Sequence, residues 1–297
     1  MNLYLGVDGG GTKTKIVIIN DAGKILFSQS GGPSSIDTVS LKETTEVIQN
    51  IVSDFNQTRT FKSAFIGLGG IATNNDRNTV LKELKKLPFF DNNSKITVDS
   101  DMVNALASGD SFNEGIVLIS GTGMVCYGNN NGKSHKCGGW GYQSLDEGSA
   151  YYLGLMALIY TVKGYDKRLK ITPFLEAVYE RLSLNNINEF ADVFKTYSRT
   201  KIASLAPLVT KFENDPYAQD IIEKATEELK ECVLTVYKEI KLTKPRLVIV
   251  GSLGNSKSLF NKKLIEKILS IDENFVITKP RKDPALAAAL LAKDVFN

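Results

Sequence analysis

The sequence predicts an α/β protein built from two domains. The chain has 297 residues, which is long for one hydrophobic core and sufficient for two. Short apolar runs typical of strands alternate with segments that read as helices. A strand, a glycine-rich turn and a second strand occur twice, once in each half, which suggests an internal repeat. We expect one domain at 1–119, joined by a C-terminal helix at 284–297, and the other at 120–283.

The first half is expected to open with three strands, because apolar runs at 1–5, 16–19 and 25–27 are separated by turn-forming residues. The elements expected after them are a helix at about 38–56, a strand at 64–68, a helix at about 76–87, a strand at 95–98 and a helix at 101–108. This alternation of strands and helices is typical of a layered α/β domain.

The second half repeats the opening and then becomes helical. Its expected elements are a strand at 115–119, a glycine turn at 120–123, a strand at 124–127, a polar turn at 129–132, mostly helix over 146–240, a strand at 246–250, a third glycine turn at 251–254, a helix after this turn, a strand at 275–277 and an alanine-rich helix from Pro284. The helical assignment rests on apolar residues at helical spacing in Ile221, Ile222, Ala225, Leu229, Cys232 and Val233.

Composition narrows the class of protein. A hydrophobic content of 42% and a charged content of 23% are ordinary for a globular chain, and a net charge of +3 gives no reason to expect a nucleic-acid partner. The cysteines are three, with no Cys-x-x-Cys pair, which favours a reducing compartment over zinc or disulfides. The N-terminus leads directly into a strand and no apolar run approaches the roughly 20 residues of a membrane span. We therefore expect a cytoplasmic protein with no membrane partner.

Residues 6–14, Gly-Val-Asp-Gly-Gly-Gly-Thr-Lys-Thr, form the turn with the clearest chemical meaning. Consecutive glycines let backbone N–H groups point into one concavity, which suits phosphate oxygens. Asp8 is placed to bind Mg²⁺, directly or through water. The alternative is a tight hairpin in which the glycines only satisfy the turn geometry. A P-loop is excluded, because Thr12 separates Gly11 from Lys13 and a strand follows in place of a helix.

Four segments in this order resemble the nucleotide-binding pattern of the actin-like ATPase and sugar kinase superfamily. They are residues 8–14, the turns 120–123 and 251–254, and a helix that carries a carboxylate, Asp101, followed by Ala105 and Leu106. The resemblance implies two actin-like domains with the active site in the cleft between them, and ATP with Mg²⁺. The ATP-binding residues it implies are Gly10, Gly11, Thr12, Lys13, Gly121, Thr122, Gly123, Ala203, Gly251, Ser252 and Asn255.

The segment Cys137-Gly-Gly-Trp-Gly141, followed by Asp146-Glu-Gly-Ser149, resembles the N-acetylglucosamine kinase branch of the BadF/BadG-type ATPase family. Sugar contacts implied by the resemblance are Ser34, Ser35, Gly69, Asp101, Gly138, Gly139, Trp140 and Asp146. Without the resemblance, Trp140 could equally be a core residue, and Asp146 could cap the following helix with Glu147 in its first turn. Relatives usually have Asn where this chain has Ser35, which leaves room for a larger sugar substituent.

The expected activity is ATP-dependent phosphorylation of an N-acetylated amino sugar, at O6, in amino-sugar or cell-wall recycling. The attacking group would be the sugar hydroxyl, with Asp101 as the catalytic carboxylate and Asp99 as the alternative. N-acetylglucosamine is the default substrate, and Ser35 makes N-acetylmuramic acid a second one. Two other functions stay open, an ATPase activator of a 2-hydroxyacyl-CoA dehydratase and a sugar sensor without turnover. A homodimer is also left open.

Overall fold

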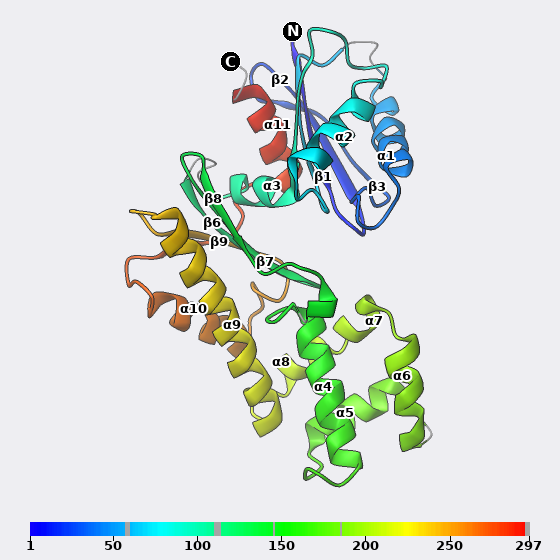
Figure 1. The fold of residues 1–297 in the computed structure, drawn as a ribbon, viewed down its shortest axis with the longest axis vertical. Coiled ribbons are helices and arrows are strands. Elements are labelled where there is room, and N and C mark those ends of the chain that lie inside the picture. Colours follow the sequence, from blue (N-terminus) through cyan, green and yellow to red (C-terminus); the bar gives the residue numbers. More distant parts are fainter. Residues whose placement is uncertain (57–59, 110–113, 145, 185, 295–297) are drawn as a thin grey trace. The chain divides into compact units, whose positions relative to one another are not determined.

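The computed structural model describes residues 1–56, 60–109, 114–144, 146–184 and 186–294. The chain divides into two compact units, one made of Met1–Phe112 with Pro280–Asn297 and the other of Asn113–Lys279. Each unit is an α/β structure around its own five-stranded sheet. Figure 1 follows the chain through both units from blue to red.

The sheet of the first unit has the strand order β3-β2-β1-β4-β5. Its strands are β1 (Leu3–Gly9), β2 (Thr14–Asn20), β3 (Ile25–Gly31), β4 (Ser63–Leu68) and β5 (Lys95–Ser100). β1 pairs antiparallel with β2 and parallel with β4, and β4 pairs parallel with β5. The carboxyl ends of β1, β4 and β5 therefore meet at one edge of the sheet, where residues that follow these strands can share a site.

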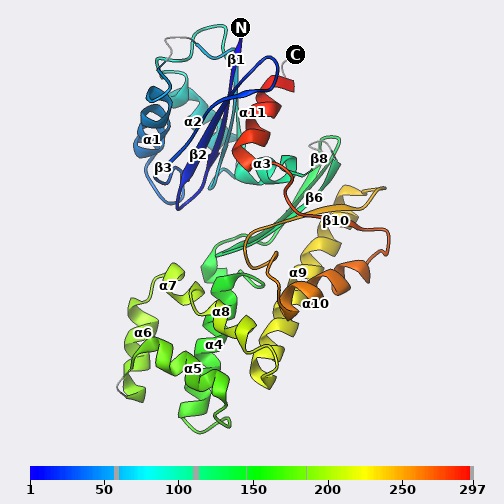
Figure 2. The same ribbon diagram turned by 180° about the vertical axis from the view of Figure 1, so that it is seen from behind.

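Helices cover both faces of this sheet, with α1 and α2 on one side and α3 and α11 on the other (Figure 2). They are α1 (Leu41–Ser53), α2 (Asn74–Leu84), α3 (Asp101–Ala107) and α11 (Pro284–Asp294). The starts of α1 and α2 differ from the expected residues 38 and 76 because capping boxes fix them, Ser40 with Glu43 and Thr73 with Asp76.

The C-terminal helix α11 packs against the centre of the sheet at Gly6 of β1. A Cβ atom at residue 6 would lie only 2.2 Å from the carbonyl oxygen of Ala285 and 2.2 Å from the backbone nitrogen of Ala289. The alanine-rich face of α11 makes this approach possible, and Ala285, Ala288 and Ala289 are fully buried. The residue before the helix also contributes, because Lys15 Nζ donates to Asp283 Oδ2 at 2.8 Å. The last segment of the chain therefore completes the first unit.

The sheet of the second unit has the order β10-β9-β6-β7-β8. Its strands are β6 (Glu114–Ser120), β7 (Met124–Asn130), β8 (Lys133–Cys137), β9 (Arg246–Val250) and β10 (Val276–Thr278). β6 pairs antiparallel with β7 and parallel with β9, as β1 does with β2 and β4, so the two sheets share one plan. Because β6 belongs to the second sheet, the unit boundary lies before it and not at the expected 119/120.

Sequence analysis missed β8 and placed the turn before it too early. β8 is a short polar edge strand, Lys-Ser-His-Lys-Cys, without apolar alternation, so it has no strand signal of its own. Asn129 and Asn130, expected in the turn, still pair with Ser134 and Lys133 in the ladder. The turn itself is formed by Asn131 and Gly132, which both have positive φ angles, as this hairpin geometry requires.

In the described residues of the second unit, seven α-helices, α4 to α10, and two short 3-10 turns follow the hairpin, as expected for a largely helical segment. Their bounds are α4 (Ala150–Tyr165), α5 (Pro173–Leu182), α6 (Phe190–Thr196), α7 (Arg199–Ala203), α8 (Ala206–Lys211), α9 (Pro216–Ile240) and α10 (Leu259–Leu269), with 3-10 turns at Tyr142–Ser144 and Ile187–Glu189. Within the described segments, none of the helices combines the length and apolar character that crossing a membrane requires.

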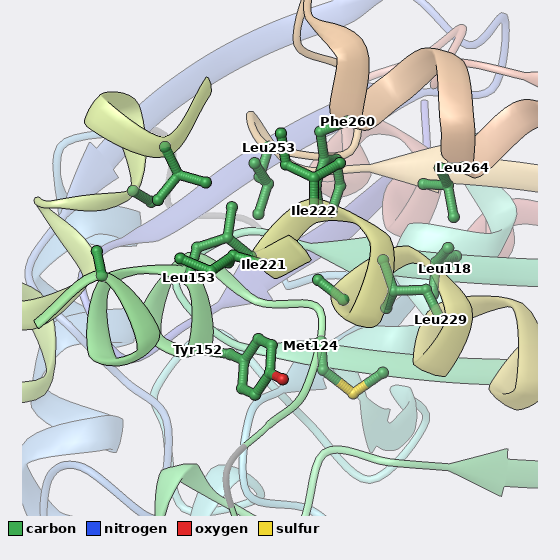
Figure 3. Close-up of a cluster of buried hydrophobic side chains, with 14 of the residues drawn as sticks. Leu118, Met124, Tyr152, Leu153, Ile221, Ile222, Leu229, Leu253, Phe260 and Leu264 are labelled. Carbon is green, nitrogen blue, oxygen red and sulfur yellow. The ribbon is translucent and has the colours of Figure 1, made fainter. Parts of the chain in front are cut away.

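The core of the second unit lies where α4, α9 and α10 meet the sheet. Figure 3 shows Leu118 of the sheet next to Leu229 of α9, and Ile221 of α9 next to Leu153 of α4. Leu153 of α4 and Phe260 of α10 complete the cluster and are fully buried. This packing holds the C-terminal end of β6 and the C-terminal end of β9 in place. The second and third glycine turns begin at these two strand ends.

Candidate active site

In the first unit, backbone hydrogen bonds join the three loops that follow β1, β3 and β4. The N–H of Gly69 donates to the carbonyl of Gly9 at 2.8 Å, and the N–H groups of Ser34 and Ser35 donate to the carbonyl of Gly10 at 3.2 and 3.3 Å. The first glycine turn is itself closed by a bond of 3.0 Å from the N–H of Gly10 to the carbonyl of Lys13. The predicted sugar residues Ser34, Ser35 and Gly69 therefore lie against the predicted phosphate turn.

Gly11, Thr12 and Lys13 are exposed at the tip of this turn. Their backbone N–H groups and the Lys13 ammonium are therefore open to an incoming anion, as a phosphate-binding turn requires. The hairpin interpretation stated for these glycines explains only the turn itself. It does not explain why the loops carrying Ser35 and Gly69 converge on the same turn.

Gly69 is the point at which the loop after β3 approaches the start of α3. A Cβ atom at residue 69 would lie 2.5 Å from Ser35 Oγ and 3.5 Å from Asp101 Oδ2. Ser35 is buried, and its hydroxyl donates to Asp37 Oδ1. Ser35, Gly69 and Asp101 therefore lie close together, and the buried Ser35 hydroxyl already has an internal partner.

Asp101 is the first residue of α3, directly after the N-cap Ser100, whose hydroxyl donates to Asp101 Oδ1 at 3.2 Å. The carboxylate is partly buried, and burial followed by the nearby charge of Asp37 raises its pKa. Asp99, the alternative, lies near the end of β5 and accepts two hydrogen bonds from the Arg77 guanidinium, at 2.7 and 3.2 Å. The Asp99 carboxylate is therefore already held by a guanidinium, so the geometry favours Asp101 as the base.

Asp8 lies in the same unit, near the end of β1. Asn104 of α3 donates to Asp8 Oδ1 at 3.0 Å and to the carbonyl of Val7 at 2.9 Å. Burial raises the pKa of Asp8 to about 6, and the negative charges of Asp101 and Asp283 act in the same direction. Such an excess of carboxylate charge suits a hard divalent cation, which takes oxygen ligands.

Asp8→Asn is expected to stabilise the metal-free protein at neutral pH. Because the pKa of Asp8 is raised to about 6, the folded protein holds a proton that the unfolded chain has already lost, so stability decreases as pH rises from about 4 to about 6. The shift corresponds to about 2–3 kcal/mol. Thermal unfolding in EDTA should therefore show a larger advantage of the variant at pH 7.5 than at pH 4. An equal difference at both pH values would contradict this.

In the second unit, the turn after β6 is held by the turn after β9 and by α4. The N–H of Gly254 donates to the carbonyl of Ser120 at 3.1 Å, and the N–H of Ala150 donates to the carbonyl of Gly121 at 2.8 Å. A Cβ atom at Gly251 would lie 2.3 Å from the Ser120 carbonyl oxygen, so only glycine allows the two turns to meet. Asn255, predicted to bind ATP, uses its amide to donate to the carbonyls of Ile249 and Gly251 and so closes the third turn.

A pocket of about 380 Å³ opens beside these two turns within the second unit. It is lined by Thr122, Ala150, Thr200, Ala203, Ser204, Ala206, Pro207, Thr210, Ser252, Leu253 and Ser256. Thr122, Ala203 and Ser252, which are far apart in sequence, were all predicted to bind ATP. The size of the pocket and its lining, which combines six Ser or Thr residues with five apolar ones, suit a nucleoside.

Asp146 does not cap α4, because the helix begins after Ser149, whose side chain accepts from the N–H of Tyr152 at 3.1 Å. Gly148, with a φ of 88°, prevents an earlier start. Instead, the carboxylate of Asp146 is 2% exposed and accepts a 2.9 Å hydrogen bond from Arg199, a residue that sequence analysis missed. Burial raises the pKa of Asp146 and outweighs three smaller effects that lower it, from the Arg199 charge, the N–H of Gly141 and the Lys136 charge.

Trp140 is not a core residue, because its side chain is 73% exposed. It lies in the loop after β8, where Gly138 and Gly139 both have positive φ angles. Lys136 donates to the carbonyl of Gly139 at 2.9 Å, and its ammonium lies 4.2 Å from the centre of the Trp140 ring. An exposed indole of this kind can cover the C–H surface of a sugar, the role implied by the resemblance.

Comparisons with known proteins cover nearly the whole chain. The sequence profile of the BadF/BadG/BcrA/BcrD ATPase family matches residues 5–292. An N-acetylmuramic acid/N-acetylglucosamine kinase from Clostridium acetobutylicum is 30% identical to the chain over 99% of both lengths. An N-acetyl-D-glucosamine kinase from Dictyostelium discoideum is 29% identical over 98% of this chain and 97% of its own length.

Two solved structures agree with this result at the level of the fold. A Chromobacterium violaceum protein, provisionally assigned as an N-acetylglucosamine kinase, has a TM-score of 0.78 at 22% identity and covers 98% of this chain and 99% of its own. A ROK family glucokinase from Streptomyces griseus, with bound glucose and AMPPNP, has a TM-score of 0.58 at 14% identity over 98% of this chain and 99% of its own. The expected fold, an α/β protein with two actin-like domains, is confirmed.

Proposed function

Because the chain belongs to the BadF/BadG/BcrA/BcrD ATPase family, we propose that it is an ATP-dependent kinase of N-acetylated amino sugars. The observation that carries this proposal is the position of Asp101, a carboxylate of raised pKa beside Gly69 in the same group of loops as the glycine turn. Two full-length relatives named as N-acetylglucosamine or N-acetylmuramic acid kinases support the substrate class. ATP as co-substrate supports a cytoplasmic location.

In the proposed reaction, the O6 oxygen of the sugar attacks the γ-phosphorus of ATP, and Asp101 accepts the proton that this hydroxyl loses. The raised pKa of Asp101 strengthens the carboxylate as a base. The pocket beside Ala203 and Ser252 would hold the nucleoside, and the turns at Gly10–Lys13 and Gly121–Gly123 would bind phosphates. Trp140 and Asp146 would contact the sugar.

Mg²⁺ fits the residues of the first unit. Asp8 offers a carboxylate beside two further negative charges, and Asn104 fixes its orientation through the 3.0 Å hydrogen bond. Asp8 would hold Mg²⁺ directly or through water, and Lys13 contributes a further positive charge. When bound, the ion would neutralise charge on the phosphates of ATP.

The direct test is coupled ADP release by the purified protein with a panel of hexoses, hexosamines and muramic acid derivatives. N-acetylglucosamine, N-acetylmuramic acid or both should give the highest kcat/KM, and glucose should be poor. A 6-deoxy analogue of the best sugar should give no ADP release above the basal rate, because it lacks the hydroxyl that accepts the phosphoryl group. Equal ADP release with and without every amino sugar would refute the proposal.

Ser35→Asn should change sugar selectivity more than total activity. Ser35 is 2% exposed and packs on Gly69, so a longer amide side chain has to enter space outside the present packing. We expect the ratio of kcat/KM for N-acetylmuramic acid to that for N-acetylglucosamine to fall, because added bulk excludes the larger O3 substituent. Ser35→Ala removes the hydroxyl without adding bulk and should leave this ratio near that of the native protein. An unmoved ratio in Ser35→Asn would show that residue 35 does not limit the sugar site.

A further inference from the structure

Arg199 is the first residue of α7, and it lies on the same helix face as a wall of the nucleotide pocket. Arg199 and Ala203 are four positions apart, so their side chains share one side of the helix. Ala203 lines the pocket, together with Thr200 of the same helix. The lining of the pocket also includes Thr122 of the second glycine turn. One face of α7 therefore runs from the nucleoside end of the pocket toward the turn at residues 120–123.

The guanidinium of Arg199 rests directly on this turn. A Cβ atom at Gly123 would lie 2.0 Å from Arg199 Nη2 and 3.2 Å from Asp146 Oδ2. The glycine at position 123 is therefore needed to admit an arginine side chain, in addition to its place in the turn. The group nearest to the backbone that would hold the phosphates is thus a fixed positive charge.

The hydrogen bonds of Arg199 are incomplete. Its Nη2 donates to Asp146 Oδ2 at 2.9 Å, in a single contact and not a two-bond fork. Within the described residues, Arg199 Nε and Asp146 Oδ1 are buried and have no hydrogen-bond partner. Buried donors and acceptors of charged groups seldom stay unsatisfied, so Arg199 Nε can donate to a ligand, whereas Asp146 Oδ1 can only accept from one.

We propose that Arg199 is a catalytic residue that binds the terminal phosphoryl group of ATP, with Asp146 holding its guanidinium over Gly123. In the transfer, a bond forms between the sugar oxygen and the γ-phosphorus, and the bond from this phosphorus to the β,γ-bridging oxygen breaks. The hydroxyl proton goes to Asp101, and ADP leaves with the bonding electron pair. Arg199 donates to non-bridging oxygens of the moving group, a role that the planar, permanently charged guanidinium fills well.

The proposal rests on the kinase function, but its first test does not need the sugar. Binding of AMPPNP and of ADP, each with Mg²⁺, is measured by calorimetry for the native protein and Arg199→Gln. We expect AMPPNP to bind about ten- to a hundredfold more weakly to the variant, the usual value of hydrogen bonds to a charged group, and ADP to bind almost unchanged. If the variant lost the same affinity for AMPPNP and ADP, or lost affinity for neither nucleotide, the proposal would be overturned.

Arg168→Gln is the matched control. Arg168 also pairs with an aspartate, donating to Asp166 from Nη2 and Nε, but it follows the C-terminal end of α4, whereas Asp146 precedes the N-terminal end. The helix has 16 residues, which separates the two sites by roughly 24 Å. This control should bind both nucleotides as the native protein does.

Turnover separates the proposed role from a structural one. Arg199→Gln should lower kcat by about 10²-fold with every accepted sugar, the usual effect of removing one group that stabilises the transition state. A rise in sugar KM at unchanged kcat would show that Arg199 only orients Asp146. A loss confined to acidic sugars would show that Arg199 binds a sugar carboxylate. Either result overturns the proposal.

Folding of the single variant can be checked independently. Arg199→Gln leaves the Asp146 carboxylate buried without its cation, so the protein can unfold for this reason alone. The double variant Arg199→Gln with Asp146→Asn removes both charges and should restore the melting temperature. It should still discriminate poorly between AMPPNP and ADP, whereas recovered discrimination would overturn the proposal. If the native protein binds AMPPNP but no amino sugar supports turnover, the kinase function fails while the binding test keeps its meaning.

Discussion

Asp101→Asn should lower kcat by about 10²-fold or more, the usual loss when a general base is removed. The amide has nearly the same shape as the carboxylate but cannot accept the hydroxyl proton. Burial raises the pKa of the Asp101 carboxyl, which means that burial disfavours its negative charge. The amide carries no charge, so the variant should be no less stable than the native protein. Steady-state kinetics with saturating ATP and the preferred amino sugar give the result, and the KM values should move much less than kcat.

Asp99→Asn is the control for this prediction. Asp99 lies two residues earlier and pairs with Arg77 at 2.7 Å, so its substitution should reduce stability more than turnover. Arg77 and Asp99 are both about one-third exposed, which limits the expected loss to about 1 kcal/mol. If Asp99→Asn lost turnover and Asp101→Asn kept it, the base would be Asp99.

The parts of the site that could be predicted from sequence depend on local backbone chemistry. Gly10 and Gly11 form the turn that the two flanking apolar strands predict, whereas Asp101 came from the resemblance, through its spacing to Ala105 and Leu106 in a helix. Ala203, Ser252 and Thr122 came from the resemblance alone, and the structure brings them to one pocket. Their shared location depends on the parallel pairing of β6 with β9, which no local pattern specifies.

The parts that could not be predicted depend on contacts between distant residues. Arg199 and Asp146 are 53 positions apart, and neither lies in a motif that names the other. The cysteines are a second case. Cys126 lies opposite Cys137 in the β7–β8 ladder, and Cys232 of α9 would lie 3.7 Å from a Cβ atom at Gly138. The spacing of the three cysteines in the sequence does not show that they lie near one another. Their proximity arises from the pairing of β7 with β8 and from the packing of α9.

Gly6 illustrates how a motif can conceal a second constraint. It is the first residue of the glycine-rich segment 6–14, whose turn is formed around Gly10 and Gly11. In the structure it lies in the middle of β1 and its Cα faces α11, a helix nearly the whole chain length away. The other central strand residues, such as Leu5 and Val7, are buried with side chains, so position 6 is small because a helix backbone occupies the space.

Gly6→Ala should therefore destabilise the first unit strongly although it adds one methyl group. The new Cβ would lie 2.2 Å from two backbone atoms, at Ala285 and Ala289, which cannot rotate away as a side chain would. Relief requires α11 to move off the sheet, and this exposes alanines that are now fully buried. We expect a loss of about 3 kcal/mol, the upper part of the range for overpacked cores. Chemical denaturation measures it, and hydrogen exchange should show the loss first in α11.

Gly32→Ala provides the comparison, because a Cβ atom there would meet only a valine methyl at 3.9 Å, and its φ is not positive. Its stability should change by less than about 1 kcal/mol, with either sign, because an added methyl also restricts the unfolded chain. If Gly6→Ala were as stable as Gly32→Ala, α11 could not be packed on β1 as closely as its buried alanines indicate. The C-terminal helix would then be dispensable, and removing residues from 284 onward should leave the first unit folded. With the packing described here, the same truncation should leave β1 exposed and the first unit unfolded.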